Sequence, residues 1–455
     1  MKKVSLSKES RLSELFAHKS SREVFDKYLP GVREGLEGQK AVLGFSLAKL
    51  FAFGQGRFPE GLLDIMDGEL AALKICEEDM KGAFTAGYPL TKDGTEIVKE
   101  PPKDAVYPGK VWRDTSGRRI QAHGGSLFYE DGTYYWYGED KMRTDGICPV
   151  WSWGIRAYKS ADLYNWEDIG TIIEPDLENP ESGLYPAKHV DRPHIKKCAA
   201  TGKYVCWIKQ SGEEACFVIL TADKFTGPYT PVRENYRPFG CHVGDFDIYV
   251  EDETGEAYLF MTADHLGIFG FRLSDDYTQA DTIVSKQYEG LNPPFCPEGP
   301  AVFKYKEKYY LLTSGMTGYI PNKSDSAVSL SLKESFKSIG NPHVNDASNA
   351  SFNSQISQVF KVPGKESLYI ALADRWVPDY PIDSKLADIF MRSAASHYEP
   401  EKYQVTDEER VIVMNSPMLD SANTSRSDYV WLPLRFEDEK VCIDWKDNWR
   451  VEDYE

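Results

Sequence analysis

The chain has 455 residues, more than a single core usually holds, which predicts two or three domains. Its formal net charge is −18 and its pI is about 5.0, so it would repel a phosphate backbone and we expect no nucleic-acid partner. No stretch reaches transmembrane length and the N-terminus MKKVSLSKES lacks the apolar core of a signal peptide, so we expect no membrane contact and a cytoplasmic location.

Residues 1–80 are predicted to be helical. Apolar side chains recur at three-and-four spacing in SRLSELFAHKSSREVFDKYLPGV, between Leu43 and Phe53, and in GLLDIMDGELAALKI. Amphipathic helices need a partner surface, so we expect one module of three or four helices. Residues 81–105 are rich in Gly, Pro, Thr and charge, which predicts a linker.

From about residue 106 the pattern becomes β. The phrase GGSLFYEDGTYYWYGED predicts a hairpin around Asp131-Gly132. Similar phrases, spaced by about 50 to 70 residues and mostly followed by an outer strand pair, predict a mainly β fold, a five-bladed β-propeller over residues 106–455. The fifth outer pair comes late, after a long insertion at residues 377–426. The five phrases begin near His123, Asp191, Asp245, Glu298 and Gln355.

The inner strands of a propeller start on the same face, so polar residues at these starts converge on the axis. Glu298 has no basic neighbour in the sequence, and burial at the axis would raise its pKa, as a general acid requires. Asp245 would set that pKa or bind sugar hydroxyls, with Asp247 on the same face of the strand. The structural alternatives are a surface turn for Glu298 and a turn cap for Asp245.

Four further positions are candidates. Asp191 leads the second blade, and Arg192 is expected on the opposite face of the strand. Glu139 ends the second strand of the first blade, where it binds substrate or simply terminates the strand. Gln355 opens the fifth blade and alone carries no functional signal. Glu289 lies in a Pro-rich loop that is long enough to fold over the site.

The metal and cofactor motifs that we sought do not occur in the sequence. The eight histidines lack zinc spacing, the eight cysteines form no C-x-x-C pair, and there is no phosphate loop or nucleophile elbow. We therefore expect no metal ligand, no cofactor and reduced thiols. His123 is expected to line the channel or to hydrogen-bond the backbone.

With these motifs placed, residues 106–455 resemble glycoside hydrolase family 43, five-bladed propeller enzymes that act with inversion. The resembling stretches together are similar to the exo-β-1,3-galactanase subgroup, which takes galactose from the β-1,3-galactan backbone of arabinogalactan. They are GRRIQAHGGSLFYEDGTYYWYGED, DRPHIKKCAATGKYVCW, EGPAVFKYKEKYYLLTSGMTGYIPN, SFNSQISQVF, ADRW and YVWLPLRF.

The resemblance implies roles for three of the candidates. Glu298 matches the general acid and Asp245 the residue that tunes its pKa. The family usually has a base aspartate at the start of the first blade, where this chain has glycines at 124–125. Gln355 matches the glutamine proposed to replace that base as its imidic acid tautomer. Because a neutral amide is a very weak base, Gln355 either uses that tautomer or orients a water that Asp191 deprotonates.

The resemblance also implies an oligosaccharide substrate. Glu139, Asp191 and Glu289 match acidic positions around bound galactose, and Thr317 and Tyr319 match substrate-contacting positions. The subgroup generally has Glu at position 191 and Trp at position 319, so these two departures leave the exact sugar open.

Three alternatives remain. One is an α-L-arabinofuranosidase or β-galactofuranosidase of the same family, and another is a non-catalytic sugar-binding propeller, favoured by the missing base. The third, a phosphorylase, needs a cluster of Arg and His for which Arg192 and Arg375 are the near candidates. The sequence does not decide the oligomeric state, the role of the helices or whether a calcium ion sits at the axis.

Overall fold

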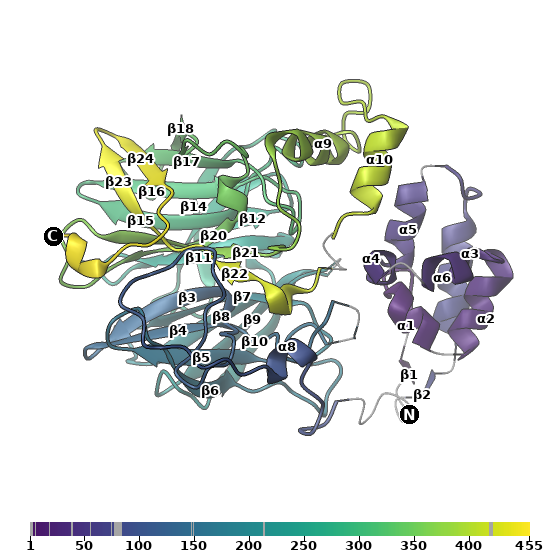
Figure 1. The fold of residues 1–455 in the computed structure, drawn as a ribbon, viewed down its shortest axis with the longest axis horizontal. Coiled ribbons are helices and arrows are strands. Elements are labelled where there is room, and N and C mark those ends of the chain that lie inside the picture. The colour runs from purple at the N-terminus through teal and green to yellow at the C-terminus, as the bar shows by residue number, and fades with distance from the viewer. Residues whose placement is uncertain are drawn as a thin grey trace.

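A computed structural model describes the chain except for residues 1–2, 5, 18, 38–39, 55, 74, 77–83, 147, 149, 213 and 418–421. Short helices come first, and strands dominate from residue 123 onward (Figure 1). Among the described residues, no helix is long and apolar enough to cross a membrane.

The N-terminal helices share one hydrophobic cluster. Phe16 and Phe25 meet edge to face in it at 4.9 Å, and Leu47 is buried with them. A left-handed Gly31 follows the second helix, where the chain must turn. The elements are α1 (Leu12–Ala17), α2 (Lys19–Tyr28), α3 (Val32–Glu37), α4 (Lys40–Leu43), α5 (Leu47–Gly54) and α6 (Leu62–Ala72), with β1 (Lys3–Val4) paired to β2 (Ile75–Cys76).

The segment expected as a linker packs on the first blade where the structure describes it. Phe84 is 3% exposed and contacts Tyr185 and Trp153 edge to face. The helix α8 (Lys92–Thr95) follows, with Thr91 as its N-cap. Residues 84–105 are therefore fixed against the β part of the molecule, while residues 81–83 lie outside the described part.

The β part is a five-bladed propeller, as predicted. Each of the first four blades is an antiparallel sheet in which consecutive strands pair, and the inner strands of all five blades contact one another in a closed ring. The first four blades are β3–β6 (His123–Glu130, Thr133–Glu139, Ile155–Ser160, Glu167–Ile173), β7–β10 (Val190–Lys197, Tyr204–Gln210, Cys216–Ala222, Thr230–Tyr236), β11–β14 (Val243–Val250, Ala257–Ala263, Gly267–Leu273, Ala280–Gln287) and β15–β18 (Glu298–Tyr305, Lys308–Ser314, Ser324–Ser329, Lys337–Gly340).

The fifth blade is assembled from distant segments. A long insertion separates its inner and outer pairs and carries two helices, α9 (Ser384–Ala395) and α10 (Asp407–Met414), which lie beyond one end of the propeller in Figure 1. The strands are β20 (Gln355–Lys361), β21 (Tyr369–Arg375), β23 (Leu432–Glu437) and β24 (Lys440–Asp444), extended by β22 (Asp428–Tyr429) and a parallel β19 (His343–Val344).

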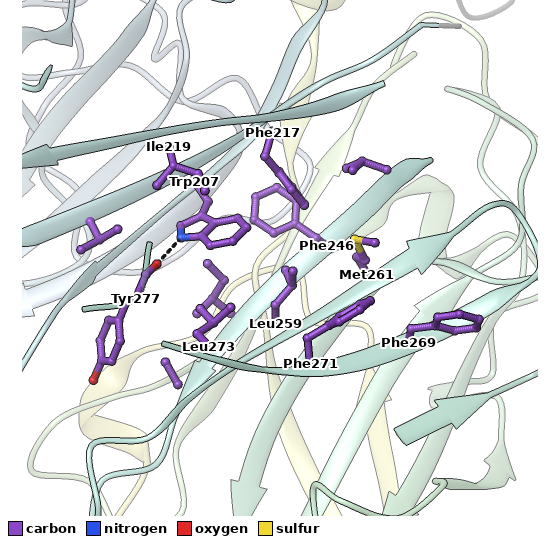
Figure 2. Packing of buried hydrophobic residues seen from close by; sticks show 14 of the residues in the cluster. Trp207, Phe217, Ile219, Phe246, Leu259, Met261, Phe269, Phe271, Leu273 and Tyr277 are labelled. Atoms are coloured by element: carbon purple, nitrogen blue, oxygen red, sulfur yellow. Dashed lines mark hydrogen bonds between the residues drawn. The ribbon is translucent and has the colours of Figure 1, made fainter. Parts of the chain in front are cut away.

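Large apolar side chains hold neighbouring blades together. Between the second and third blades, Trp207 packs edge to face on Phe217, which in turn meets Phe246 (Figure 2). The buried indole N–H of Trp207 donates to the carbonyl of Tyr277 at 2.8 Å, so burying this residue leaves no polar atom unpaired. Such packing fixes the blades, and with them the strand starts at the axis.

Every inner strand has a register shift near its start. In antiparallel pairs such a shift marks a bulge, which re-aims side chains and breaks their alternation between faces. The shifts lie between His123 and Ser126, Asp191 and His194, Val243 and Phe246, Glu298 and Ala301, and Ile356 and Gln358. Strand alternation therefore fails at the residues that face the axis.

Candidate active site

Polar residues from the blade starts meet in one cavity of about 600 Å³. Four of the predicted candidates, at blade starts or at the end of β4, line this cavity: Glu298, Asp245, Asp191 and Glu139. Two basic residues that were not predicted as site residues, Arg192 and Lys209, line it as well. Gln355 lines the same cavity. The predicted convergence of side chains from separate blades is thus observed.

Glu298 is held in its neutral form. It is the first residue of β15, and burial raises the pKa of its carboxyl to about 8, with the charge of Asp245 adding to that rise. Lys209 and Arg192 oppose the rise without cancelling it. A carboxyl with this pKa carries a proton at neutral pH and can donate it.

Asp245 is held in the opposite state. Burial alone would raise the pKa of its carboxyl, but two cations outweigh burial and bring that pKa to about 2. The Nε atom of Arg192 lies 3.0 Å from Oδ2, and Nζ of Lys209 lies 2.6 Å from Oδ1. The ionised Asp245 in turn raises the pKa of Glu298, which fits the predicted tuning of one carboxyl by the other.

Arg192 faces the axis, contrary to the expectation that it would point to the other side of its strand. Its φ of 49° and the bulge after Asp191 turn the side chain inward. Besides pairing with Asp245, its guanidinium donates to Oε1 of Gln355 at 2.6 Å, and its backbone N–H donates to Oε1 of Glu139 at 3.1 Å. No signal in a single sequence marks this bulge, because a strand pattern assumes regular alternation.

Gln355 is oriented by four hydrogen bonds. Its Oε1 accepts from Arg192 and, at 3.3 Å, from the indole of Trp376. Its Nε2 donates to Oγ of Ser314 at 2.9 Å and to Oε1 of Glu298 at 3.3 Å. The amide oxygen therefore faces a cation and the amide nitrogen faces the proposed acid.

Asp191 and Glu139 lie on the same side of the cavity. Oδ1 of Asp191 accepts from the indole N–H of Trp151 at 2.9 Å, and Oδ2 accepts from Ser211. Glu139 is buried, and burial raises its pKa to about 7, with the charge of Asp191 adding to the rise. Lys141, which lies 2.7 Å away, opposes this rise without cancelling it. Both carboxylates are thus fixed by donors that come from neighbouring loops and strands.

The glycines at the start of the first blade have no room for a side chain. Gly124 has φ of +56°, and a Cβ there would come within 2.6 Å of Oε1 of Glu139. At Gly125 a Cβ would come within 2.2 Å of the carbonyl oxygen of Tyr137. The carboxylate of Glu139 therefore occupies the space beside the position where the family resemblance implies a base aspartate.

Thr317 and Tyr319 line the cavity as expected. The hydroxyl of Thr317 donates to the carbonyl of Ile320 and accepts from Asn322, both at 2.6 Å, so it shapes the loop. The ring of Tyr319 lies 5.0 Å from Trp376 and 6.3 Å from Trp151, which makes an aromatic side to the pocket.

Two predicted contact residues do not reach the cavity. Glu289 is 60% exposed and faces Lys286 at 3.9 Å, because the loop after β14 directs it to solvent. His123 is fully buried beneath the pocket, stacked on Tyr429 at 5.3 Å and 2.8 Å from the side-chain oxygen of Gln121. Burial lowers the pKa of His123 well below its usual value. Neither residue lines the cavity in this structure.

The described residues contain no group of three His, Cys, Asp or Glu side chains placed to hold a metal ion. The cysteine thiols described there are unpaired by disulfides. The side chains that line the cavity are carboxyls, three basic groups (Lys49, Arg192 and Lys209), histidines, an amide, hydroxyls, and aromatic and other apolar groups.

This geometry defines a propeller with an acid–carboxylate pair in an axial pocket, which is the architecture of a sugar-cleaving enzyme. The sequence profile of glycosyl hydrolases family 43 matches residues 90–384. The chain belongs to that family and is a glycoside hydrolase. Comparison with curated protein sequences finds no match.

Solved structures share this architecture. A family 43 β-1,3-galactosidase matches with 30% identity and a TM-score of 0.61, over 77% of this chain and 65% of that one, so this chain spans slightly less than two thirds of it. An exo-β-1,3-galactanase from Phanerochaete chrysosporium, solved with β-1,3-galactotriose, matches with 23% identity and a TM-score of 0.60, over 77% and 68%. The exo-β-1,3-galactanase from Clostridium thermocellum matches with 24% identity and a TM-score of 0.58, over 76% and 66%. The latter two show a shared fold.

Proposed function

We propose that this protein is an inverting, exo-acting glycoside hydrolase that releases galactose from β-1,3-linked galacto-oligosaccharides. The main support is the pair of carboxyls at the axis, with the pKa of Glu298 at about 8 and that of Asp245 at about 2. One carboxyl is protonated and the other ionised at neutral pH, which is how paired carboxyls divide acid and electrostatic roles.

Glu298 is the general acid in this proposal. It donates its proton to the glycosidic oxygen as the bond from that oxygen to the anomeric carbon breaks. Water attacks the same carbon from the opposite face, and its proton leaves to a carboxylate. Asp245 stays ionised throughout, keeps the pKa of Glu298 high and, through Arg192 and Lys209, fixes the floor of the pocket.

Gln355 positions the water and Asp191 accepts its proton. The amide oxygen already accepts from Arg192 and Trp376, which leaves it little capacity as a base. Its nitrogen touches Glu298 at 3.3 Å, much closer than the roughly 6.5–9.5 Å that separates acid and base in inverting enzymes. The bound sugar must therefore separate Gln355 from Glu298, and the released N–H then holds the incoming water.

The galactose assignment rests on the 30% identical β-1,3-galactosidase and on the pocket residues that the galactanase resemblance names. Asp191, Glu139, Thr317 and Tyr319 all line the cavity and are proposed to contact the terminal sugar. We also propose that residues 1–80 form one helical module, attached through residues 81–105 to a catalytic propeller at 106–455. The shared cluster of the N-terminal helices supports this division.

The test is incubation of the purified protein with β-1,3-galactobiose and, in parallel, with nitrophenyl α-L-arabinofuranoside. We expect galactose release by the wild type and a loss of about a hundredfold or more for Glu298→Gln, because the acid is removed. Gln355→Ala should also be strongly impaired. Turnover of the arabinofuranoside in place of the galactobiose would contradict the galactose assignment and favour the arabinofuranosidase alternative. Binding without any turnover would indicate a sugar-binding propeller.

A further inference from the structure

The N-terminal helices reach into the rim of the catalytic pocket. Arg11, just before α1, is only 6% exposed although it lies far in sequence from the propeller. Its guanidinium donates to the carbonyl of Cys148 at 3.3 Å and lies 3.0 Å from Nε2 of His189. It also stands 5.3 Å above the ring of Trp151. A buried cation held by three groups fixes the position of the helices at this edge.

Two residues that Arg11 contacts, His189 and Trp151, line the catalytic pocket. The ring of His189 stacks on Trp151 at 4.0 Å, and the indole N–H of Trp151 donates to Asp191. The helices therefore support the same aromatic ring that orients one of the proposed catalytic carboxylates. Lys141, which pairs with Glu139, lies 4.5 Å from the same ring.

Helix α5 lines the cavity itself. Lys49, Ala52 and Phe53 face the same 600 Å³ space as Glu298 and Asp191, and we call these three residues the α5 wall. Phe53 also packs against the apolar cluster under α9 and α10, so the wall is attached to the insertion of the fifth blade. In Figure 1, α5 stands next to α10 at the end of the propeller that carries the insertion.

The cavity thus has two chemically different parts. Its floor is made of the carboxyls and cations of the propeller axis, which suit the hydroxyls of a terminal sugar. Its far side, from α5 and α9, carries apolar side chains such as Phe53, Phe390 and Ala394, with Lys49 and Ser393 among them. Apolar surface suits the C–H faces of a further sugar ring better than its hydroxyls. In an exo-acting enzyme that further ring belongs to the leaving group.

We propose that the α5 wall forms one side of the subsite that receives the leaving sugar, so that the N-terminal helices complete the substrate pocket. This inference rests on the proposed exo-glycosidase function. It assigns the substrate class as short β-linked oligosaccharides, whose second ring lies between α5 and α9. A volume of about 600 Å³ lies within the range of pockets that enclose a small ligand, which fits a chain of a few sugars.

The test fills the subsite from the helix side. Ala52 is exposed and lines the cavity, so Ala52→Trp narrows the subsite without disturbing the helical core. Two substrates are compared: β-1,3-galactobiose, whose leaving group is a sugar, and β-galactosyl fluoride, whose leaving group is one atom. We expect kcat/KM for galactobiose to fall about tenfold, while kcat/KM for the fluoride stays within about twofold. The matched control is Ile65→Trp on α6, where the residue is 54% exposed and outside the cavity.

A second variant tests the aromatic ring of the wall directly, because Ala52→Trp tests only the effect of added bulk. Phe53→Ala removes the aromatic ring of the wall, and we expect about a fivefold loss on galactobiose alone. Phe53 also stacks on Phe45 at 5.2 Å within the helices. Phe51→Ala is therefore its control, because Phe51 makes a comparable stack on Phe58 at 4.3 Å on the same helix but does not line the cavity. Equal losses on both substrates, no loss at all, or the same loss in the controls would overturn the inference.

The proposed function can fail independently of this inference. If the wild type cleaves arabinofuranosides and not galactobiose, the galactose assignment is wrong. The same variants are then compared on arabinobiose and on α-L-arabinofuranosyl fluoride, whose leaving group is one atom. A selective loss on the disaccharide would still support the α5 wall as a leaving-sugar subsite, and an unselective loss would refute it.

Discussion

At the scale of single residues, the chemistry of the pocket depends on how two basic side chains are shared among the carboxyls around them. Arg192 and Lys209 both pair with Asp245, and Lys209 lies 3.6 Å from Asp191. Among the described residues Glu298 forms no such ion pair, and it instead contacts the neutral amide of Gln355. The carboxyl without a cationic partner keeps its proton, and that residue is the proposed acid.

This division of charge predicts the pH dependence of catalysis. Because burial and Asp245 raise the pKa of Glu298 to about 8, kcat/KM should fall as pH rises through about 8 and the acid loses its proton. Asp245→Asn removes the like charge and leaves Arg192 and Lys209 less neutralised. Both effects lower the pKa of Glu298, so the alkaline limb should move down by about one unit or more.

The measurement is a kcat/KM profile from pH 5 to 10 for the wild type and for Asp245→Asn. Asp140→Asn is the control, since Asp140 is a buried carboxyl on the first blade that pairs with Arg156 away from Glu298. An alkaline limb that stays in place in Asp245→Asn would contradict the tuning role. An alkaline limb that moves to higher pH in Asp245→Asn would contradict the tuning role as well.

Residues at the blade starts could be predicted from the sequence because a repeat fixes their place. The repeat alone places Glu298, Asp245 and Asp191 at the axis as candidates, whereas Gln355 gains its role only when the family resemblance is added to its place in the repeat. Arg192 was assigned to the wrong face, because the bulge that turns it depends on pairing with the next strand. Glu289 was expected at the pocket from its place in a long loop, and loop direction is set by packing that a sequence pattern does not contain.

At the scale of single elements, the bulge at the start of β3 explains why this strand start carries no acidic side chain facing the axis. Gly124 adopts a left-handed conformation and the carboxylate of Glu139 fills the space beside it. A single substitution of Gly124 by Asp therefore could not restore the base aspartate that the family usually has at this position. The acidic side chains beside this strand start are instead Glu139 on β4 and Asp191 on the second blade.

Substitution at this glycine gives a direct test. Gly124→Ala should destabilise the protein by more than the ~1–2 kcal/mol of left-handed strain, because its Cβ also meets Glu139. Gly132→Ala is the matched control, since Gly132 has φ of +81° with nothing within 4 Å of its Cβ. Gly124→Asp should lower activity and not raise it. Thermal unfolding and galactobiose assays measure both effects, and a more active Gly124→Asp would refute this account of β3.

At the scale of the whole molecule, the ring closes where the two ends of the propeller meet. The backbones of Val106 and Trp449 exchange hydrogen bonds of 2.9 and 3.1 Å. The indole N–H of Trp449 donates to the carbonyl of Trp431 at 2.8 Å, and both rings are buried in the cluster that joins the first and fifth blades. Trp449 therefore adds to the packing and hydrogen bonding that hold the first and fifth blades together.

Trp449→Ala should cost about 3–5 kcal/mol of unfolding free energy, as for other buried aromatic residues. Trp445→Ala is the nearby control, because Trp445 is 39% exposed whereas Trp449 is 3% exposed. We expect the control to cost about 1 kcal/mol or less. Denaturant unfolding measures both values, and equal values would show that Trp449 does not close the ring.

The fold of the propeller could be predicted from the sequence, because hairpin turns and repeat spacing are local or periodic signals. The relation between the N-terminal helices and the pocket could not. The contact of Arg11 with His189 joins residues that are far apart in sequence, and nothing in the helical pattern marks which surface the helices will cover. The position of the helices in the 377–426 insertion could not be predicted either, because it depends on packing against Phe53.

The stereochemistry of the first product tests the central claim most directly. Proton NMR recorded within minutes of adding enzyme to the methyl β-glycoside of β-1,3-galactobiose distinguishes the anomers of released galactose before they interconvert, because the methyl galactoside that leaves has no free anomeric centre. If water attacks opposite to the bond protonated by Glu298, the released galactose appears first as the α-anomer, and Glu298→Gln gives no such signal on that timescale. Initial appearance of the β-anomer, or undiminished release by Glu298→Gln, would contradict the account.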